Sequence, residues 1–224
     1  MMKEHYLAAV PTRVRQGAIT CHMVHLVDED ASVFVAFSLM GLPRFGPLIL
    51  PRVLTSACNA FQSARASSLP DRLVHVIGVM RQEMLVLCGQ LIELIQPDLA
   101  VALMGIDSEG MMHVLSTGPC RVYVFHQKVP ERLTPREGNE RGIVGGGKIS
   151  HCTKGLELPS IVFGGSDIAF SSAAVESVGC LLEQRASPSP QELVGLLLEP
   201  AMKAGVGGAA FALRITGSLH QAMR

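Results

Sequence analysis

The sequence of 224 residues has no tryptophan, only 4% aromatic residues and only 17% charged residues. Hydrophobic residues make up 48%, so the chain is globular rather than disordered, and its core must be filled mainly by aliphatic side chains and methionine. Lysine plus arginine equals aspartate plus glutamate, at 19 each. The chain therefore lacks the basic excess that is typical of nucleic-acid-binding proteins, and we expect no nucleic acid among its partners.

Long apolar runs are also missing. No stretch reaches about 18 uninterrupted apolar residues, the usual length of a membrane span. The longest candidate, residues 73–95, is interrupted by charged and polar side chains. The N-terminal residues lack the basic start and apolar run of a secretory signal. These features predict a cytoplasmic protein that does not contact a membrane.

The six cysteines contain no C-x-x-C pair and are widely spaced along the chain. Such spacing favours reduced thiols in the core over a disulfide framework or a zinc site. The residues are Cys21, Cys58, Cys88, Cys120, Cys152 and Cys180.

The pattern of apolar residues predicts strands in runs and helices in pairs. Two strands (19–27 and 32–38) precede two helices (51–66 and 68–96), and three strands follow, at 99–106, 111–117 and 120–126. A Gly-rich irregular stretch, 130–159, leads to a strand (160–165), two helices (171–185 and 189–205) and a last strand, 209–216. This order predicts an α+β protein in which two sheets pack together and are covered by helices.

Two local motifs resemble ligand sites. Residues 142–148 match the first seven positions of a phosphate-binding P-loop, but Ile149 follows where a magnesium-binding Ser or Thr is needed. We interpret this segment as a surface loop. His22 and His25 are an odd number of positions apart, so on a strand they point to opposite faces and do not share one metal ion.

Six short stretches, spread in order over nearly the whole chain, carry a wider pattern: Val14–Thr20, Val33–Gly41, Val114–Tyr123, Leu133–Glu137, Ser160–Asp167 and Gly207–Leu213. Together they resemble the motifs of the metal-dependent 2C-type (PPM) family of serine/threonine protein phosphatases. In the third stretch Gly118, Arg121 and Tyr123 match that family's Gly-Asp-Ser-Arg-Ala-Tyr hairpin. In the fifth stretch Ser166 and Asp167 match its Ser-Asp-Gly motif.

The resemblance implies a fold. It implies a four-layer αββα sandwich, in which two antiparallel sheets are flanked by helix pairs. It also implies one domain over residues 1–217, with a shortened flap at about 134–159 and a tail at 218–224.

The resemblance also implies what the site has lost. In that family, aspartates and waters hold two divalent cations that activate a water for attack on the phosphoryl group. Thr20, Ser38 and Gly207 stand at positions expected to be acidic, and Asp167 is the single matching metal ligand. One carboxylate does not hold two hard dications, so we predict a pseudophosphatase with no catalytic residue and no cofactor.

Several alternatives remain open at this point. Arg15 matches the phosphate-binding residue of the family, and it is either a vestigial phosphate site or part of an ordinary salt bridge. An active phosphatase would need Mn²⁺ or Mg²⁺ on other acids, such as Asp28, Glu29, Asp30 or Asp107. Another layered αββα protein, such as an Ntn-hydrolase-like subunit, is the third interpretation. We expect a protein partner, and the apolar composition with zero net charge also favours a homo-oligomer.

Overall fold

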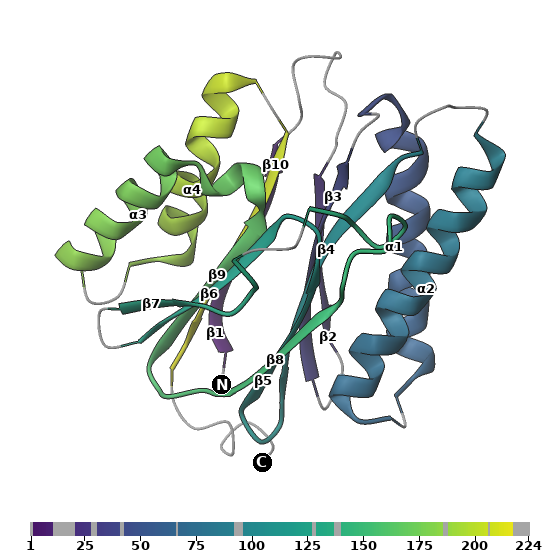
Figure 1. Cartoon of the computed structure of the whole chain (residues 1–224). Helices are drawn as coiled ribbons and strands as arrows, with labels where there is room; N and C mark the ends of the chain where they lie inside the picture. The colour runs from purple at the N-terminus through teal and green to yellow at the C-terminus, as the bar shows by residue number, and fades with distance from the viewer. Residues whose placement is uncertain are drawn as a thin grey trace.

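The computed structural model describes residues 2–10, 21–27, 31–40, 43–65, 67–91, 96–126, 129–136, 140–185, 188–205 and 207–216. Within these residues, two five-stranded antiparallel sheets lie face to face in the middle of the molecule (Figure 1). One pair of helices covers the outer face of each sheet. The predicted α+β sandwich of four layers is therefore confirmed.

The first sheet has the strand order β1-β10-β9-β6-β7. Its strands are β1 (Met2–Val10), β10 (Gly208–Ile215), β9 (Ser160–Ser166), β6 (Cys120–His126) and β7 (Val129–Arg132). The helices α3 (Ser172–Gln184) and α4 (Pro190–Ala204) cover it. A 3-10 helix, η2 (Asp167–Phe170), joins β9 to this helical layer.

The second sheet has the strand order β2-β3-β4-β5-β8. Its strands are β2 (Cys21–Val27), β3 (Ala31–Met40), β4 (Asp98–Asp107), β5 (Met111–Thr117) and β8 (Ser150–Gly155). The helices α1 (Gly46–Ser63) and α2 (Leu69–Gln90) cover it, and the 3-10 helix η1 (Pro43–Phe45) precedes α1.

The alternation of side chains along β4 shows how the layers are joined. Leu99, Val101 and Leu103 are buried in the cluster beneath α1 and α2, whereas Ala100 and Ala102 are buried between the two sheets. Successive side chains of a strand point to opposite faces, so this one strand serves two cores. A third apolar cluster lies between the first sheet and the α3–α4 pair.

Two helix starts agree with their sequence signals. At the start of α2 the Ser68 hydroxyl accepts a hydrogen bond from the backbone N–H of Asp71 at 3.4 Å. At the start of α4 Ser189 and Glu192 form a complete capping box, and Gly205 ends the helix in the left-handed conformation, with φ of 70°.

Some elements differ from the sequence-based expectation. Strands β1, β7 and β8 were not predicted, and β7 and β8 occupy part of the stretch that we expected to be irregular. Helix α1 begins five residues before Pro51, at Gly46, and α2 ends at Gln90 rather than at 96. Cys180 is exposed on α3, so the prediction of a core thiol was wrong for that residue.

The structure tests two broader expectations, on membrane spans and on the domain boundary, only in part. The described residues include no helix that is long and apolar enough to cross a membrane. The domain boundary at 217 stays a prediction, because residues 217–224 lie outside the described part of the chain.

Candidate functional site

Strand ends from both sheets meet at one end of the sandwich, uppermost in Figure 1. Ser38 lies near the end of β3, Asp167 directly follows β9, and Gly207 directly precedes β10. Strands β9 and β10 are antiparallel neighbours, with Gly165 opposite Ala210. Asp167 and Gly207 therefore lie at the same end of these two strands.

A series of neighbouring residues links Ser38 in the second sheet to Asp167 at the end of β9 in the first. Ser38 is paired with Ala100 of β4, and a Cβ added to Gly118 would lie only 2.7 Å from the Cβ of Ala100. The next residue, Pro119, accepts a hydrogen bond from the backbone N–H of Asp167 at 2.9 Å. The structure therefore brings three of the sequence-predicted positions, Ser38, Asp167 and Gly207, to one end of the fold.

The carboxylate of Asp167 is bound by an internal cation. The Nε of Arg121, on β6, donates a hydrogen bond of 2.6 Å to its Oδ1. Partial burial lowers the pKa of Arg121, but the hydrogen bond and negative charge of Asp167 outweigh this effect and raise the pKa above its ordinary value. The guanidinium also lies 5.8 Å from the centre of the Phe170 ring, which fixes it on a second side.

The other predicted positions add no carboxylate to this site. Ser38 has a neutral hydroxyl, and Gly207 is buried and has no side chain. Arg15 and Thr20 lie outside the described residues. Among the residues that the structure describes, no group of three or more histidines, cysteines, aspartates and glutamates is placed to hold a metal ion. The residues described at this end therefore do not fit a pair of divalent cations.

A second carboxylate at the same end, which the sequence did not identify, holds the Gly-rich loop. Asp98 starts β4 opposite Met40. Its Oδ2 accepts hydrogen bonds from the N–H groups of Gly142 (2.7 Å) and Gly145 (3.1 Å). Its Oδ1 accepts them from Val144 (2.8 Å) and from Leu99 (2.7 Å). The P-loop-like amides thus bind an internal carboxylate.

The glycines of this loop are required by close packing. A Cβ added to Gly142 would lie 2.3 Å from the carbonyl oxygen of Leu99, and one added to Gly147 would lie 2.0 Å from that of Arg141. Residues 147–149 are coil and β8 follows, so no helix begins where a nucleotide site would need one. The interpretation as a loop agrees with this geometry.

Comparison with known proteins identifies the fold. No protein-family model matches the sequence, and no curated protein matches it. Solved structures match over nearly the whole chain. The serine/threonine phosphatase Stp1 from Staphylococcus aureus has a TM-score of 0.78 at 13% identity, over 97% of this chain and 96% of that one. The chain has the fold of the 2C-type (PPM) phosphatases.

Two further structures agree. The S. agalactiae serine/threonine phosphatase has a TM-score of 0.72 at 14% identity, over 96% of this chain and 99% of that one. The PPM Ser-Thr phosphatase MsPP from Mycobacterium smegmatis, solved with cacodylate, has a TM-score of 0.66 at 16% identity over the same shares. The resemblance inferred from six short stretches is confirmed at the level of the fold.

The PPM fold places the alternative acid Asp107 far from Asp167. Asp107 ends β4 opposite Ala31, whereas Ala100, near the start of β4, pairs with Ser38. A ten-residue strand is roughly 30 Å long at about 3.3 Å per residue, so Asp107 lies at the opposite end of the sheet. Residues 28–30 lie outside the described part, but the strand ends that flank them, Val27 and Ala31, lie at the Asp107 end.

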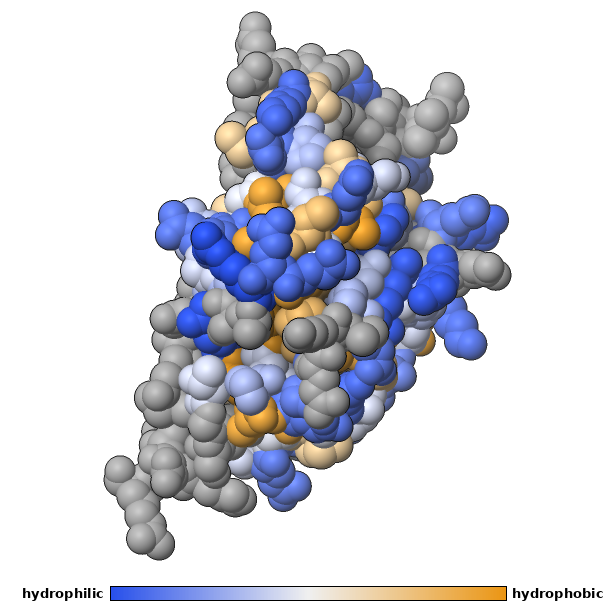
Figure 2. Space-filling view, turned by 90° about the vertical axis from the view of Figure 1, so that its left-hand side faces the viewer, coloured by the Kyte–Doolittle hydropathy of each residue, from blue (hydrophilic) through white to orange (hydrophobic). Residues whose placement is uncertain are grey.

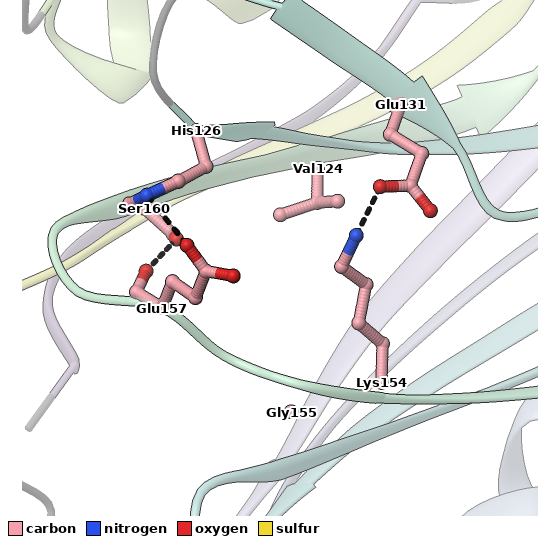
Figure 3. Close-up of a pocket in the computed structure, with 7 residues that line it drawn as sticks. All are labelled: Val124, His126, Glu131, Lys154, Gly155, Glu157 and Ser160. Carbon is pink, nitrogen blue, oxygen red and sulfur yellow. Dashed lines mark hydrogen bonds and ion pairs between the residues drawn. The ribbon is translucent and has the colours of Figure 1, made fainter.

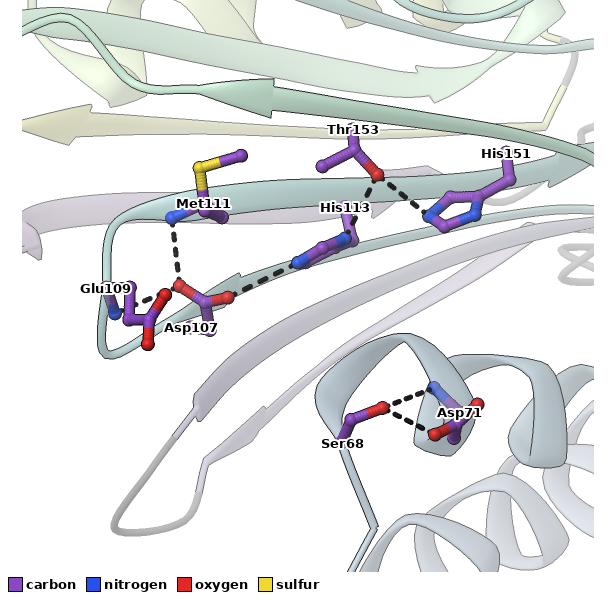
Figure 4. A network of polar contacts seen from close by, with 8 residues as sticks. All are labelled: Ser68, Asp71, Asp107, Glu109, Met111, His113, His151 and Thr153. Atoms are coloured by element: carbon purple, nitrogen blue, oxygen red, sulfur yellow. Dashed lines mark hydrogen bonds and ion pairs between the residues drawn. The ribbon is translucent and has the colours of Figure 1, made fainter.

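Asp107 has local partners of its own. Its Oδ1 accepts hydrogen bonds from the N–H groups of Glu109 (3.0 Å) and Met111 (2.9 Å), which shapes the β4–β5 turn. Its Oδ2 lies 3.3 Å from Nε2 of His113, whose Nδ1 contacts Thr153 (Figure 4). This carboxylate therefore stabilises the β4–β5 turn and contacts His113 on β5.

A pocket of about 290 Å³ lies between the ends of β6 to β9 (Figure 3). His126 Nε2 lies 2.8 Å from a carboxylate oxygen of Glu157 on one side, and Lys154 pairs with Glu131 on the other. The pocket contains Ser160, which starts β9, whereas Asp167 follows the end of that strand. It is therefore separate from the site of Asp167, and its charged groups are already paired with one another.

Proposed function

We propose that this chain is a pseudophosphatase, a PPM-fold protein without phosphatase activity that acts by binding other proteins. The pairing of Asp167 with Arg121 at 2.6 Å is the observation that carries this proposal. Asp167 is the single acid that matches the metal-binding pattern, and its charge is already balanced by a guanidinium. Ser38 and Gly207 offer no anionic oxygen nearby.

The physical argument concerns the charge that a metal pair requires. Mg²⁺ and Mn²⁺ give up water reluctantly and prefer oxygen ligands, and a pair of such dications needs several anionic oxygens to balance its charge. A dication at Asp167 would also have to displace the Arg121 guanidinium or share the carboxylate with it. Either arrangement opposes binding, so the nucleophile-generating step of metal-dependent phosphatases has no support at this site.

A binding role follows from what the chain retains. The two sheets and their helix pairs form three buried apolar clusters, so the chain presents a folded surface to a partner. We place this protein in the cytoplasm, with a protein as its partner.

The test is a titration with Mn²⁺ by calorimetry, with hydrolysis of p-nitrophenyl phosphate measured in parallel. We expect neither binding of two ions nor turnover by the wild-type protein. Tight binding of two ions together with hydrolysis that Asp167→Ala abolishes would overturn the proposal.

A gain-of-binding variant is the matched control. Ser38→Asp and Gly207→Asp, combined with Arg121→Ser, supply two carboxylates and release Asp167. We expect this variant to bind Mn²⁺ more tightly than the wild type, with the same circular-dichroism spectrum. If the wild type and this variant bind Mn²⁺ equally, the missing acids are not the reason for inactivity.

A further inference from the structure

The two helical layers of this molecule carry opposite charge on opposite outer faces. Leaving aside the buried Arg72, the α1–α2 layer, residues 43–90, has a net charge of +2, from four arginines against Asp71 and Glu83. The α3–α4 layer, residues 172–204, has a net charge of −2, from four glutamates against Arg185 and Lys203. The two layers face away from each other, on either side of the paired sheets (Figure 1). The whole chain has zero net charge, so two copies do not repel each other as a whole.

Ion pairs within each layer neutralise some of its charged side chains, and the remaining ones carry the excess charge. Arg52 pairs with Glu83 at 3.0 Å, and on the other layer Arg185 pairs with Glu192 and Lys203 pairs with Glu199. Glu176 and Glu183 lie outside these pairs on α3, seven positions apart and thus on one helix face. The acidic excess is therefore concentrated along α3.

The exposed apolar side chains lie on the same two layers. Among the described residues, six of the nine large hydrophobic side chains that are exposed belong to them: Leu48, Val74, Leu85, Val86, Val175 and Met202. Isolated exposed residues need no explanation, but a concentration on two layers marks candidate contact surfaces.

The acidic layer is hollowed between its helices. A groove of about 470 Å³ is lined by Leu181 of α3 and by Gly195, Leu196 and Met202 of α4, with Glu192 and Glu199 at its border. A Cβ added to Gly195 or to Gly179 would meet nothing within 4 Å, so the helix backbones are bare at this surface. Figure 2 shows this side of the molecule, where apolar patches lie between hydrophilic side chains.

The basic layer has the complementary charge and exposes apolar side chains. On α2, Val74, Arg81 and Leu85 lie at helical spacing on one outward face, with Gly78 between them. We propose that this α1–α2 face of one copy docks in the acidic α3–α4 groove of a second copy. The apolar side chains fill the groove, and the arginines face the acidic excess along α3 beside it. This names a second copy of the chain as the protein partner, and in that sense it rests on the proposed function.

The contact joins different surfaces of two copies, so it is heterologous. Because the two faces lie on opposite sides of the molecule, each copy keeps one unused face after the first contact. Such contacts continue as an open chain of copies, or close into a ring if the rotation between neighbours permits it. The assembly therefore grows beyond a dimer as the concentration rises.

Sedimentation velocity of the purified full chain tests the proposal. We expect the weight-average sedimentation coefficient to rise with protein concentration and to fall in about 0.5 M NaCl, where the Debye length is only a few ångström. Gly195→Trp adds a large side chain at the groove, where the new Cβ meets nothing within 4 Å, and Leu85→Glu places an acid on the basic face. Each variant alone is expected to sediment as a monomer. Ile149→Glu is the matched control, because Ile149 is 43% exposed, as is Leu85, but lies outside both layers.

A mixture of the two variants makes the test specific for a head-to-tail contact. Gly195→Trp keeps an intact basic face and Leu85→Glu keeps an intact groove, so an equimolar mixture is expected to form heterodimers and nothing larger. A wild-type chain that stays monomeric, a mixture that stays monomeric, or association that either variant leaves intact would each overturn the proposal. If the chain self-associates and also shows Mn²⁺-dependent turnover, the proposed loss of phosphatase activity is refuted but the contact between copies is not. Failure of the proposed function can therefore be told apart from failure of the proposed contact.

Discussion

The Nε of Arg121 lies 2.6 Å from Oδ1 of Asp167, at the end of the sandwich where β3, β9 and β10 terminate or begin. The side chains of these two residues are 26% and 46% exposed, so water screens part of their attraction. The pair is still well placed to compete with a metal, since it supplies a positive charge directly at the carboxylate. An internal guanidinium thus already balances the charge of the carboxylate at this end of the fold.

We predict that Arg121→Ala lowers the free energy of unfolding by about 1 kcal/mol, the scale of a partly exposed ion pair and a weak cation–π contact. Urea denaturation followed by circular dichroism measures the change. The same variant frees Asp167 but adds no acid, so we expect no binding of two Mn²⁺ ions in calorimetry. Arg52→Ala, which removes the surface pair with Glu83, is the control for loss of an arginine away from the site. Two-ion binding by Arg121→Ala would mean that other ligands exist at this end.

The amides that bind Asp98 make this residue the anchor of the loop at 141–148. Asp98→Asn places an NH₂ group or a neutral oxygen against four N–H donors, and we expect a loss of about 3 kcal/mol in stability. Limited proteolysis with trypsin probes how firmly the loop is held, because Arg141 and Lys148 are exposed at its ends. We expect faster cleavage after these residues in Asp98→Asn under native conditions.

The control for that experiment is Asp107→Asn. Asp107 also accepts two backbone hydrogen bonds, but in the β4–β5 turn at the other end of the sheet. It should lower stability without a selective rise in cleavage at Arg141 and Lys148. Equal cleavage of this loop in both variants would show that Asp98 has no specific role in holding it.

The layers could be predicted from the sequence, but three of the four strands at the sheet edges, β1, β7 and β8, could not. Strand β4 and helix α4 follow from apolar periodicity and from the Ser189–Glu192 cap, which are local signals. Strand β8 has the polar sequence Ser-His-Cys-Thr-Lys-Gly and alternates between exposed and half-buried positions, and it is held by backbone pairing with β5. Strand β1 pairs with β10, about 200 residues away, and no local pattern reveals such a partner.

The candidate site was predictable only in part, for a similar reason. The Ser166-Asp167 and Gly118-to-Tyr123 matches located one end of the fold. The pairing of Arg121 with Asp167 joins a residue of β6 to the first residue of η2, and nothing in their spacing shows it. Asp98 gave no signal at all, because its partners in the loop begin 44 positions later, and we interpreted that loop without reference to any carboxylate.

Alkylation of the cysteines should follow burial. Cys180 is exposed on α3, whereas Cys88 is buried; burial, helped by the negative charge of Asp98, raises the pKa of the Cys88 thiol. At low protein concentration we expect iodoacetamide to modify Cys180 well before Cys88, as measured by peptide mass spectrometry. Because Cys180 lies on the acidic layer, its rate should also fall as protein concentration rises in the wild type, but not in Gly195→Trp. A rate for Cys180 that is independent of concentration in associating wild type would contradict a contact through α3.

The capping box of α4 predicts how stability depends on acid. Glu192 accepts hydrogen bonds from the backbone N–H (3.0 Å) and hydroxyl (2.9 Å) of Ser189 and pairs with Arg185 at 2.6 Å; these contacts lower its pKa below the ordinary value of 4.5. A lowered pKa in the folded state means that the stabilisation is fully present above the unfolded-state pKa and is lost as pH falls through the folded-state pKa. Glu192→Gln should therefore be less stable than wild type at neutral pH, and the difference should shrink in acid below the ordinary carboxyl range. Urea midpoints measured from neutral to acidic pH give both curves. Glu199→Gln, an exposed glutamate of the same helix away from the cap, is the matched control, and it should keep the acid-dependent loss that Glu192→Gln removes.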